Sequence, residues 1–314
     1  MSALRLTVPG NVLLLGEYAV LEEGGLGFAM AVEVRARLEA VPWGSLRVEG
    51  SWPGRSLTWT PDTRSESPLV TAVADTVSEY LGSPCTGTVH LDTTAFFSAG
   101  GRKAGLGSSA AVCVALVCGL LHLAGRREAA AGPEAPMLAL RAHRRVQRGR
   151  GSGYDILTSF HGGSGLVRGG ASPSWQACGL PPQSRVALFP GPAPVSTADA
   201  VERYSRWKSR NPGAAADFLR ESNAAILSFS RSRSLEDALP FFEACRKLGT
   251  RLGSEIGVSA ELAAPPGLDA RWCKALGAGN ELGMCLLAPG AELPSDGGTW
   301  ARVQGAQTGV TWEQ

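Results

Sequence analysis

The residues best suited to chemistry lie in a glycine-rich segment that leads into an apolar helix. Residues 105–111 read Gly-Leu-Gly-Ser-Ser-Ala-Ala, and residues 108–123 have the composition of a buried helix, with Gly125 just past its end. Glycines let the backbone approach a ligand closely, and the first N–H groups of a helix have no internal partner. The segment therefore predicts an anion site suited to phosphate, although a tight turn with a serine cap would have the same residues.

Two polar side chains near this segment could take part in phosphate chemistry. Ser109 can offer a hydroxyl to a magnesium ion, and Lys103 can neutralise phosphate charge. The segment is no Walker loop, because Leu106 and Gly107 stand where that motif requires a lysine before the serine. It matches the dinucleotide fingerprint only loosely, since no strand directly precedes it and no acid ends a strand about 20 residues later. A dehydrogenase is therefore not favoured.

A second glycine-rich segment, residues 151–155, ends in Asp155. An aspartate on such a turn can accept the proton of an attacking hydroxyl during phosphoryl transfer, or it can simply cap the turn. Four arginines precede the segment at helical spacing and share one face: Arg141, Arg144, Arg145 and Arg148. That face suits either solvent or a phosphorylated substrate. A third segment, residues 277–280, could line a nucleotide or form a tight strand–turn.

The elements that would position these residues predict a two-domain α+β protein. Helical spacing is present at residues 69–81, 108–123, 136–147, 154–160, 197–208, 214–230 and 235–252. Alternating or apolar runs predict strands at 4–8, 12–15, 32–41, 46–49, 57–60, 89–92, 185–189 and 284–287, with residues 9–11 breaking the first two apart. Prolines and glycines between residues 170 and 195 place the domain junction there, giving domains 1–175 and 176–314.

Composition and charge exclude several classes of protein. The net charge of +2 over 314 residues is too small for a general nucleic-acid binder. The longest run without a polar residue, residues 110–121, is shorter than the roughly twenty residues of a membrane span. Seven cysteines, odd in number and without a Cys-x-x-Cys pair, argue against a disulfide framework or a zinc site. We therefore expect a cytoplasmic protein with small-molecule ligands and neither nucleic-acid nor membrane partners.

The motifs in this order resemble the GHMP kinase superfamily, and more narrowly its phosphomevalonate kinases, with spirochaete members especially similar. Residues 9–21, Pro-Gly-Asn-Val-Leu-Leu-Leu-Gly-Glu-Tyr-Ala-Val-Leu, look like the first motif of that family. Residues 103–112 look like its phosphate-binding second motif, and residues 142–155 look like the segment with the catalytic aspartate. The resemblance implies an N-terminal domain like domain 2 of ribosomal protein S5 and a ferredoxin-like C-terminal domain. It also implies ATP and Mg²⁺ as cofactors, with phosphoryl transfer to 5-phosphomevalonate.

The same resemblance assigns roles to individual residues. Asp155 and Lys103 would be catalytic, and Ser109 would face the magnesium ion. The ATP phosphates would be held by Gly105, Leu106, Gly107, Ser108, Ser109 and Ala110. The acceptor would be bound by Asn11, Glu17, Tyr18, Arg144, Arg148, Ser152, Gly153, Gly277 and Ala278.

Two departures from the family pattern keep other activities open. Asn11 stands where the family usually has a lysine, and residues 274–283 lack the serine and one residue of the usual third motif. The alternatives are another GHMP small-molecule kinase, acting on mevalonate or a sugar, and a catalytically weak nucleotide-binding homologue.

Overall fold

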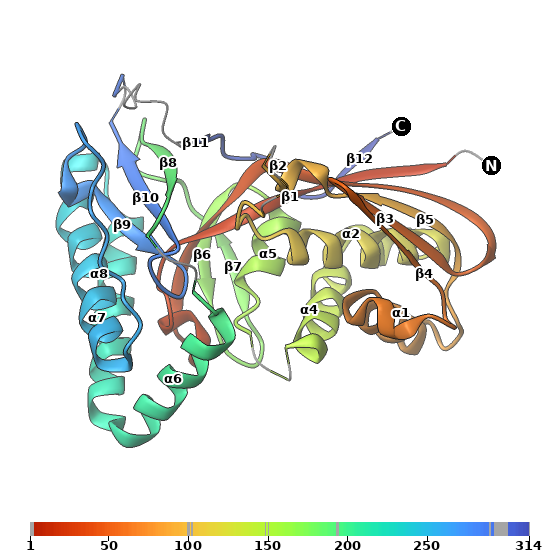
Figure 1. Cartoon of the computed structure of the whole chain (residues 1–314), viewed down its shortest axis with the longest axis horizontal. Coiled ribbons are helices and arrows are strands. Elements are labelled where there is room, and N and C mark those ends of the chain that lie inside the picture. Colours follow the sequence, from red (N-terminus) through yellow and green to blue (C-terminus); the bar gives the residue numbers. More distant parts are fainter. Residues whose placement is uncertain are drawn as a thin grey trace. The chain divides into compact units, whose positions relative to one another are not determined.

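The computed structural model describes residues 3–98, 101, 103–147, 149, 151–192, 195–288, 290–291 and 301–313 (Figure 1). The strands are β1 (Leu4–Leu15), β2 (Leu26–Ser45), β3 (Arg47–Trp52), β4 (Arg55–Trp59), β5 (Thr86–Asp92), β6 (Ser164–Arg168), β7 (Ser174–Ala177), β8 (Arg185–Pro190), β9 (Cys273–Leu276), β10 (Leu282–Leu287), β11 (Ala301–Val303) and β12 (Thr311–Glu313). The helices are α1 (Pro68–Leu81), α2 (Ser108–Leu123), α3 (Arg127–Ala131), α4 (Glu134–Val146), α5 (Tyr154–His161), α6 (Thr197–Arg210), α7 (Pro212–Ser230) and α8 (Leu235–Ile256). The mixed α+β class expected from the sequence is confirmed.

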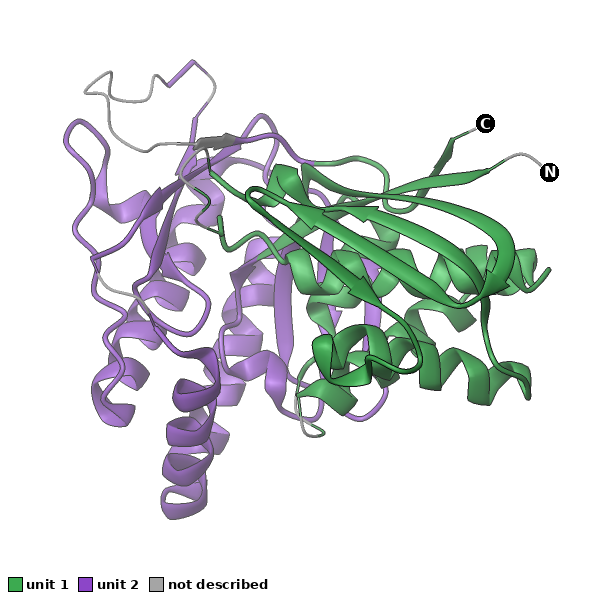
Figure 2. Cartoon of the chain, turned by 45° about the vertical axis from the view of Figure 1, so that its right-hand side comes forward, with its two compact units in different colours: residues 1–12, 31–163, 306–314 green, residues 13–30, 164–305 purple. Residues whose placement is uncertain are grey.

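The chain forms two compact units built from interleaved segments (Figure 2). Unit 1 comprises residues 1–12, 31–163 and 306–314, and unit 2 comprises residues 13–30 and 164–305. The unit boundaries therefore fall inside β1 and β2, so each of these strands contributes to both units. These interleaved units differ from the two consecutive domains, 1–175 and 176–314, expected from the sequence. That division into consecutive domains stays a prediction.

Unit 1 is a twisted sheet with helices packed on one face. The strand order is β12-β1-β2-β5-β3-β4, in which β3 and β5 are parallel while β1–β12, β2–β5 and β3–β4 are antiparallel. Figure 1 shows α1, α2 and α4 on the same side of β3, β4 and β5. Most of α2 is buried among its neighbours α1, α4 and α5, which explains why its sequence is apolar on every face. This central helix is the element that must position the first glycine-rich segment.

Unit 2 has a four-stranded antiparallel sheet with the order β11-β8-β10-β9. The helices α7 and α8 pack against each other, and aromatic side chains such as Tyr204 and Phe218 bury the contact region of α6 and α7. The first residues of β2 pair with β6, which in turn pairs with β7. The third glycine-rich segment forms the connection between β9 and β10.

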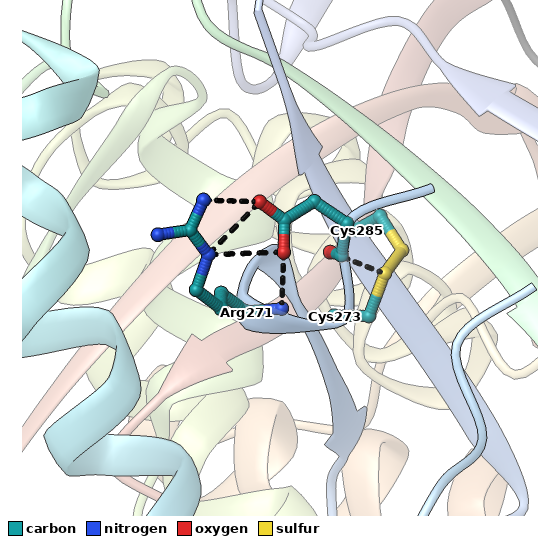
Figure 3. The surroundings of a disulfide bond; sticks show 4 residues. Arg271, Cys273 and Cys285 are labelled. Atoms are coloured by element: carbon teal, nitrogen blue, oxygen red, sulfur yellow. Dashed lines mark hydrogen bonds and ion pairs between the residues drawn. A yellow bond between two sulfur atoms is a disulfide. The ribbon is translucent and has the colours of Figure 1, made fainter. Parts of the chain in front are cut away.

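A disulfide bond joins the two strands that flank this connection. Cys273 of β9 and Cys285 of β10 are directly opposite in the antiparallel register, and both are buried (Figure 3). Beside them, Arg271 forms an ion pair with Asp269, which also caps the short turn before β9. The cysteine count and spacing did not indicate this bond, because the pairing depends on the register of the hairpin. The remaining cysteines are free: Cys85, Cys113, Cys118, Cys178 and Cys245.

The predicted break at residues 9–11 is wrong. One continuous strand, β1, runs through Pro9 and Gly10. A Cβ atom on Gly10 would lie 2.4 Å from the carbonyl oxygen of Leu106 and 2.8 Å from the Phe96 ring. Gly10 is therefore present because another backbone lies directly against the strand, rather than because the chain turns.

Across the described part of the chain, no helix combines the length and apolarity that a membrane crossing requires.

Candidate functional site

The glycine-rich segment of unit 1 places backbone N–H groups at the start of α2 for which the described residues supply no partner. Gly105 and Gly107 have φ angles of +74° and +69°, a left-handed conformation that glycine adopts without strain. Gly107 is the N-cap of α2, and no side chain of the described residues caps this end. The first intrahelical bond is donated by the Ala111 amide to the Gly107 carbonyl at 3.2 Å. The N–H groups that precede it are available to an anion, which the helix dipole also favours.

The segment is held in place by β1. The Asn11 amide donates to the carbonyl of Leu106 at 3.0 Å, and the Asn11 side chain lies against Gly107. That side chain is 1% exposed, and its Nδ2 donates to the Ser159 hydroxyl of α5 at 2.9 Å. The predicted acceptor-binding residue Asn11 is thus buried between the segment and α5.

Ser108, Ser109 and Lys103 border a cavity of about 400 Å³ in unit 1. Lys103 is exposed and lies in an isolated bridge with Phe97, so its ammonium group is at the surface of the unit. The other lining is mainly apolar, from residues that include Trp52, Leu57, Leu69, Val70, Leu91 and Val112. An apolar cavity that adjoins an anion site has the character of a pocket for a flat, uncharged group linked to phosphate.

Asp155 lies in the first turn of α5, which begins at Gly153 with a φ angle of +79°. One carboxylate oxygen, Oδ1, accepts the amide of Ile156 at 2.9 Å, and Oδ2 lies 3.6 Å from Nδ1 of His143. The Asp155 side chain is 19% exposed and that of His143 is 6% exposed. The carboxylate is therefore oriented on one side and still accessible on the other, as a group that acts on a ligand must be.

The loop before α5 is fixed by α4. Nε of Arg144 donates to the carbonyl of Gly151 at 3.1 Å, and Ser152 and Gly153 are buried. The Ser152 hydroxyl accepts the amide of Tyr154 at 3.4 Å. The predicted acceptor-binding residues Arg144, Ser152 and Gly153 thus shape the loop that leads to Asp155.

The other arginines of α4 have different roles. Arg141 and Arg145 both pair with Glu79 of α1, and these pairs hold the two helices together at the surface. The negative partner Glu79 could not be recognised from the arginine spacing, because it lies on another helix. Arg148 lies outside the described residues.

In unit 2, the structure groups four predicted acceptor-binding residues with a buried ion pair. Nζ of Lys274 donates to a carboxylate oxygen of Glu17, and it also donates to the carbonyl of Leu14 at 3.2 Å. The Tyr18 hydroxyl donates to the carbonyl of Ala278, and burial followed by the charge of Glu17 raises the pKa of that phenol. Glu17, Tyr18, Lys274, Gly277 and Ala278 line one small cavity of about 20 Å³.

Three side-chain pairs were not found from the sequence. They are Asn11 with Ser159, His143 with Asp155, and Glu17 with Lys274. The partners are far apart along the chain in the first and last pair, so local patterns hold no signal for them.

No group of three histidine, cysteine, aspartate or glutamate side chains could hold a metal ion among the described residues. A magnesium ion in this site would be held by phosphate oxygens of a nucleotide together with a protein hydroxyl such as that of Ser109, which borders the cavity. The residues present fit that arrangement, since the exposed Ser109 hydroxyl stands at the anion site.

Comparison with known proteins finds a family match within unit 1. Residues 68–163 match the family described as GHMP kinases N terminal domain. The matched residues include α2, α4 and α5. GHMP kinases are phosphotransferases that use ATP. A search of curated protein sequences finds no match.

Solved structures share the fold over nearly the whole chain. The Lin0012 protein from Listeria innocua has a TM-score of 0.83 and 19% identity, with 100% of each chain covered. The phosphomevalonate kinase of Streptococcus pneumoniae, in complex with phosphomevalonate and AMPPNP, has a TM-score of 0.69 and 18% identity, with 93% of each chain covered. The mevalonate kinase of Methanococcus jannaschii has a TM-score of 0.65 and 16% identity, with 91% of each chain covered. The fold is that of the two-domain GHMP kinases.

Proposed function

We propose that this chain, which has the GHMP kinase fold and a GHMP kinase N-terminal domain, transfers the γ-phosphoryl group of ATP to 5-phosphomevalonate. The observation that carries the kinase assignment is in unit 1: an uncapped helix N-terminus and the accessible Asp155 belong to two helices that pack against each other. Phosphoryl transfer requires bound phosphates, neutralised charge and an oriented acceptor, and these groups can supply them.

The nucleotide would bind through the start of α2 and the adjoining cavity. The backbone N–H groups of residues 107–110 would hold the phosphates, and the apolar part of the 400 Å³ cavity has room for a base. Ser109 would face Mg²⁺, which neutralises phosphate charge when bound. Lys103, at the rim of the same cavity, would stabilise the charge of the transferred group.

Asp155 would orient the acceptor. In the reaction proposed, an oxygen of the acceptor phosphate bonds to the γ-phosphorus, the bond to the β,γ-bridging oxygen breaks, and ADP leaves. Because a phosphate acceptor is already anionic, the carboxylate has no obligatory proton to remove and serves mainly to align the reactants. The hydrogen bond from the Ile156 amide holds that carboxylate in one orientation.

The acceptor is assigned from the motif resemblance. The residues proposed to bind it directly are Glu17, Tyr18, Arg144, Arg148, Ser152, Gly153, Gly277 and Ala278. Asn11, which is buried between the glycine-rich segment and α5, would act only through these two elements. A solved structure with the same fold is a phosphomevalonate kinase with phosphomevalonate bound, which is consistent with this choice for the present chain.

A second candidate is a kinase whose acceptor carries a hydroxyl and no phosphate, such as mevalonate or a sugar. It is favoured by the pairing of Arg141 and Arg145 with Glu79, which neutralises part of the positive face of α4 that an acceptor phosphate would require. For such an acceptor, Asp155 would remove the hydroxyl proton as a general base.

The experiment that tests the proposal is release of ADP by the purified protein with Mg²⁺ and ATP. 5-Phosphomevalonate and mevalonate are compared in parallel, with Ser109→Ala to remove the hydroxyl at the anion site. Ser205→Ala is the matched control, because Ser205 is an exposed helix serine whose hydroxyl, among the described residues, bonds only to Val201 of its own helix.

Turnover of 5-phosphomevalonate alone, reduced in Ser109→Ala and kept in Ser205→Ala, supports the proposal. Turnover of mevalonate alone supports the second candidate. If AMPPNP binds and neither acceptor is phosphorylated, the chain is a nucleotide-binding homologue without this activity.

A further inference from the structure

Asn11 lies where β1, the glycine-rich segment and α5 meet inside unit 1. We propose that Asn11 is a positioning residue, which sets the place of the phosphate-binding segment relative to the helix that carries Asp155. This inference rests on the proposed kinase function for its catalytic meaning, although the mechanical coupling can be measured without it.

The first half of the coupling joins Asn11 to the segment. Its backbone amide holds the carbonyl of Leu106 at 3.0 Å. Its side-chain amide lies so close to Gly107 that an added Cβ atom would be 2.2 Å from Nδ2 and 2.6 Å from Oδ1. The carboxamide of Asn11 therefore fixes the position of Gly107 relative to β1, and with it the position of the start of α2.

The second half joins Asn11 to α5. Nδ2 of Asn11 donates to the hydroxyl of Ser159 at 2.9 Å, and Ser159 is completely buried. Ser159 follows Asp155 by four residues, so the two side chains lie on the same face of α5, one turn apart. A displacement of Ser159 therefore moves the turn that presents the carboxylate.

The Oδ1 atom of the carboxamide argues against a purely structural role for Asn11. Oδ1 of Asn11 is buried and has no hydrogen-bond partner among the described residues. A buried acceptor without a partner destabilises the fold, and an apolar side chain of similar size would avoid that penalty. Asn11 is better explained by what its Nδ2 holds in place than by a contribution to stability.

The test uses Asn11→Ala, Ser159→Ala and the double variant. Ser159→Ala removes a single oxygen atom, so it tests the coupling even if Asn11→Ala fails to fold. Thr158→Val is the matched control, because Thr158 is equally buried on α5 and its hydroxyl bonds, within the part of the chain that the structure describes, only to the Tyr154 carbonyl of the same helix. Amide hydrogen exchange is followed in residues 103–110 and 151–157, and affinity for AMPPNP with Mg²⁺ is measured by calorimetry.

Each coupling variant is expected to speed exchange in both segments and to weaken AMPPNP binding roughly tenfold. The double variant should weaken it no more than the larger single effect, because both substitutions break one link. Thr158→Val should leave the exchange of residues 103–110 and the AMPPNP affinity unchanged, whatever its effect on overall stability.

Two results would overturn the inference. One is faster exchange confined to residues 151–157 in Ser159→Ala, with unchanged AMPPNP affinity. The other is full additivity in the double variant, which would show two independent effects. Failure of the proposed function gives a different pattern: exchange and AMPPNP affinity change together as expected, while the wild type phosphorylates neither acceptor.

Discussion

The glycine-rich segments 105–107 of unit 1 and 277–280 of unit 2 differ in where their polar groups are directed. In unit 1, Gly107 begins α2 without a side-chain cap, and the Ser109 hydroxyl is exposed. In unit 2, the Ala278 carbonyl accepts the Tyr18 hydroxyl, and Nδ2 of Asn280 donates to the carbonyl of Glu261 at 3.1 Å. The first segment thus leaves donors for a ligand, whereas the second is bonded within its own unit.

The same contrast exists among helix N-termini in unit 1. The α1 helix begins with Ser67, whose hydroxyl accepts the amide of Val70, whereas α2 and α5 begin with the left-handed glycines Gly107 and Gly153. Among the described residues no side chain bonds the first amides of α2, whereas at α5 the Ser152 hydroxyl accepts the Tyr154 amide and Asp155 accepts the Ile156 amide. The start of α2 is therefore a helix end whose amides are open to a ligand.

The largest effect is expected from breaking the ion pair beside the unit 2 segment. Lys274→Met would leave the carboxylate of Glu17, 11% exposed, without its partner. We expect a loss of about 3–5 kcal/mol in the free energy of unfolding, measured by urea denaturation, because an unpaired buried charge is strongly destabilising. Adding Glu17→Gln should recover part of that loss.

The control for this ion pair is Lys208→Met. Lys208 pairs with Glu22, and its side chain is 44% exposed, so solvent screens the interaction and the expected loss is under about 1 kcal/mol. Equal effects of the two substitutions would show that the unit 2 segment does not depend on an internal charge pair.

The disulfide should stabilise the same hairpin. Cys273 and Cys285 are separated by 12 residues, and closing a loop of that size stabilises the fold by about 3 kcal/mol. Replacing both cysteines by alanine is expected to lower the urea midpoint and to leave AMPPNP affinity unchanged, because the phosphate-binding segment lies in unit 1. In the presence of dithiothreitol, the unfolding difference between the variant and the wild type should shrink. A fall in AMPPNP affinity would contradict the contrast between the two segments.

Gly107→Ala tests the unit 1 segment directly. A side chain there meets a positive φ angle and the carboxamide of Asn11, so the segment must shift. We expect AMPPNP affinity to fall by at least about tenfold, since a shift of the first helical amides weakens each of their bonds to phosphate. The matched control is Gly82→Ala at the end of α1, where φ is +70° and no described atom lies within 4 Å of the added Cβ. That variant should lose stability while keeping its affinity.

Much of the fold could be predicted because its signals are local. The range 108–123 expected for α2 is the observed range, and the range expected for α1 differs by one residue at its start. The break expected in β1 was wrong because Gly10 responds to a neighbour, Leu106, that is 96 positions away in sequence. Long apolar helices carry their own signal, whereas a glycine alone does not reveal whether it turns or makes room.

Single residues of the candidate site stand out in the sequence, whereas the contacts between them do not. The segment at residues 105–110 and Asp155 stand out by composition, and the structure places them on helices that pack together. The link from Asn11 to Ser159 spans 148 residues and that from Glu17 to Lys274 spans 257, so only the folded chain reveals them. The roles proposed for these residues remain predictions for the experiments above.

The smallest effect is expected at a capped helix. Ser234→Ala removes the hydroxyl that accepts the Asp237 amide at the start of α8, and loss of such a cap lowers stability by about 1 kcal/mol. AMPPNP affinity should not change, because Ser234 lies in unit 2 and does not border the cavity of unit 1. Ser109→Ala should show the reverse pattern, with weaker AMPPNP binding in Mg²⁺ and almost no loss of stability, since its hydroxyl is exposed and caps nothing in α2. If both serines affected stability alone, the uncapped start of α2 would have no ligand role, and the contrast between capped and uncapped helices would have only a structural meaning.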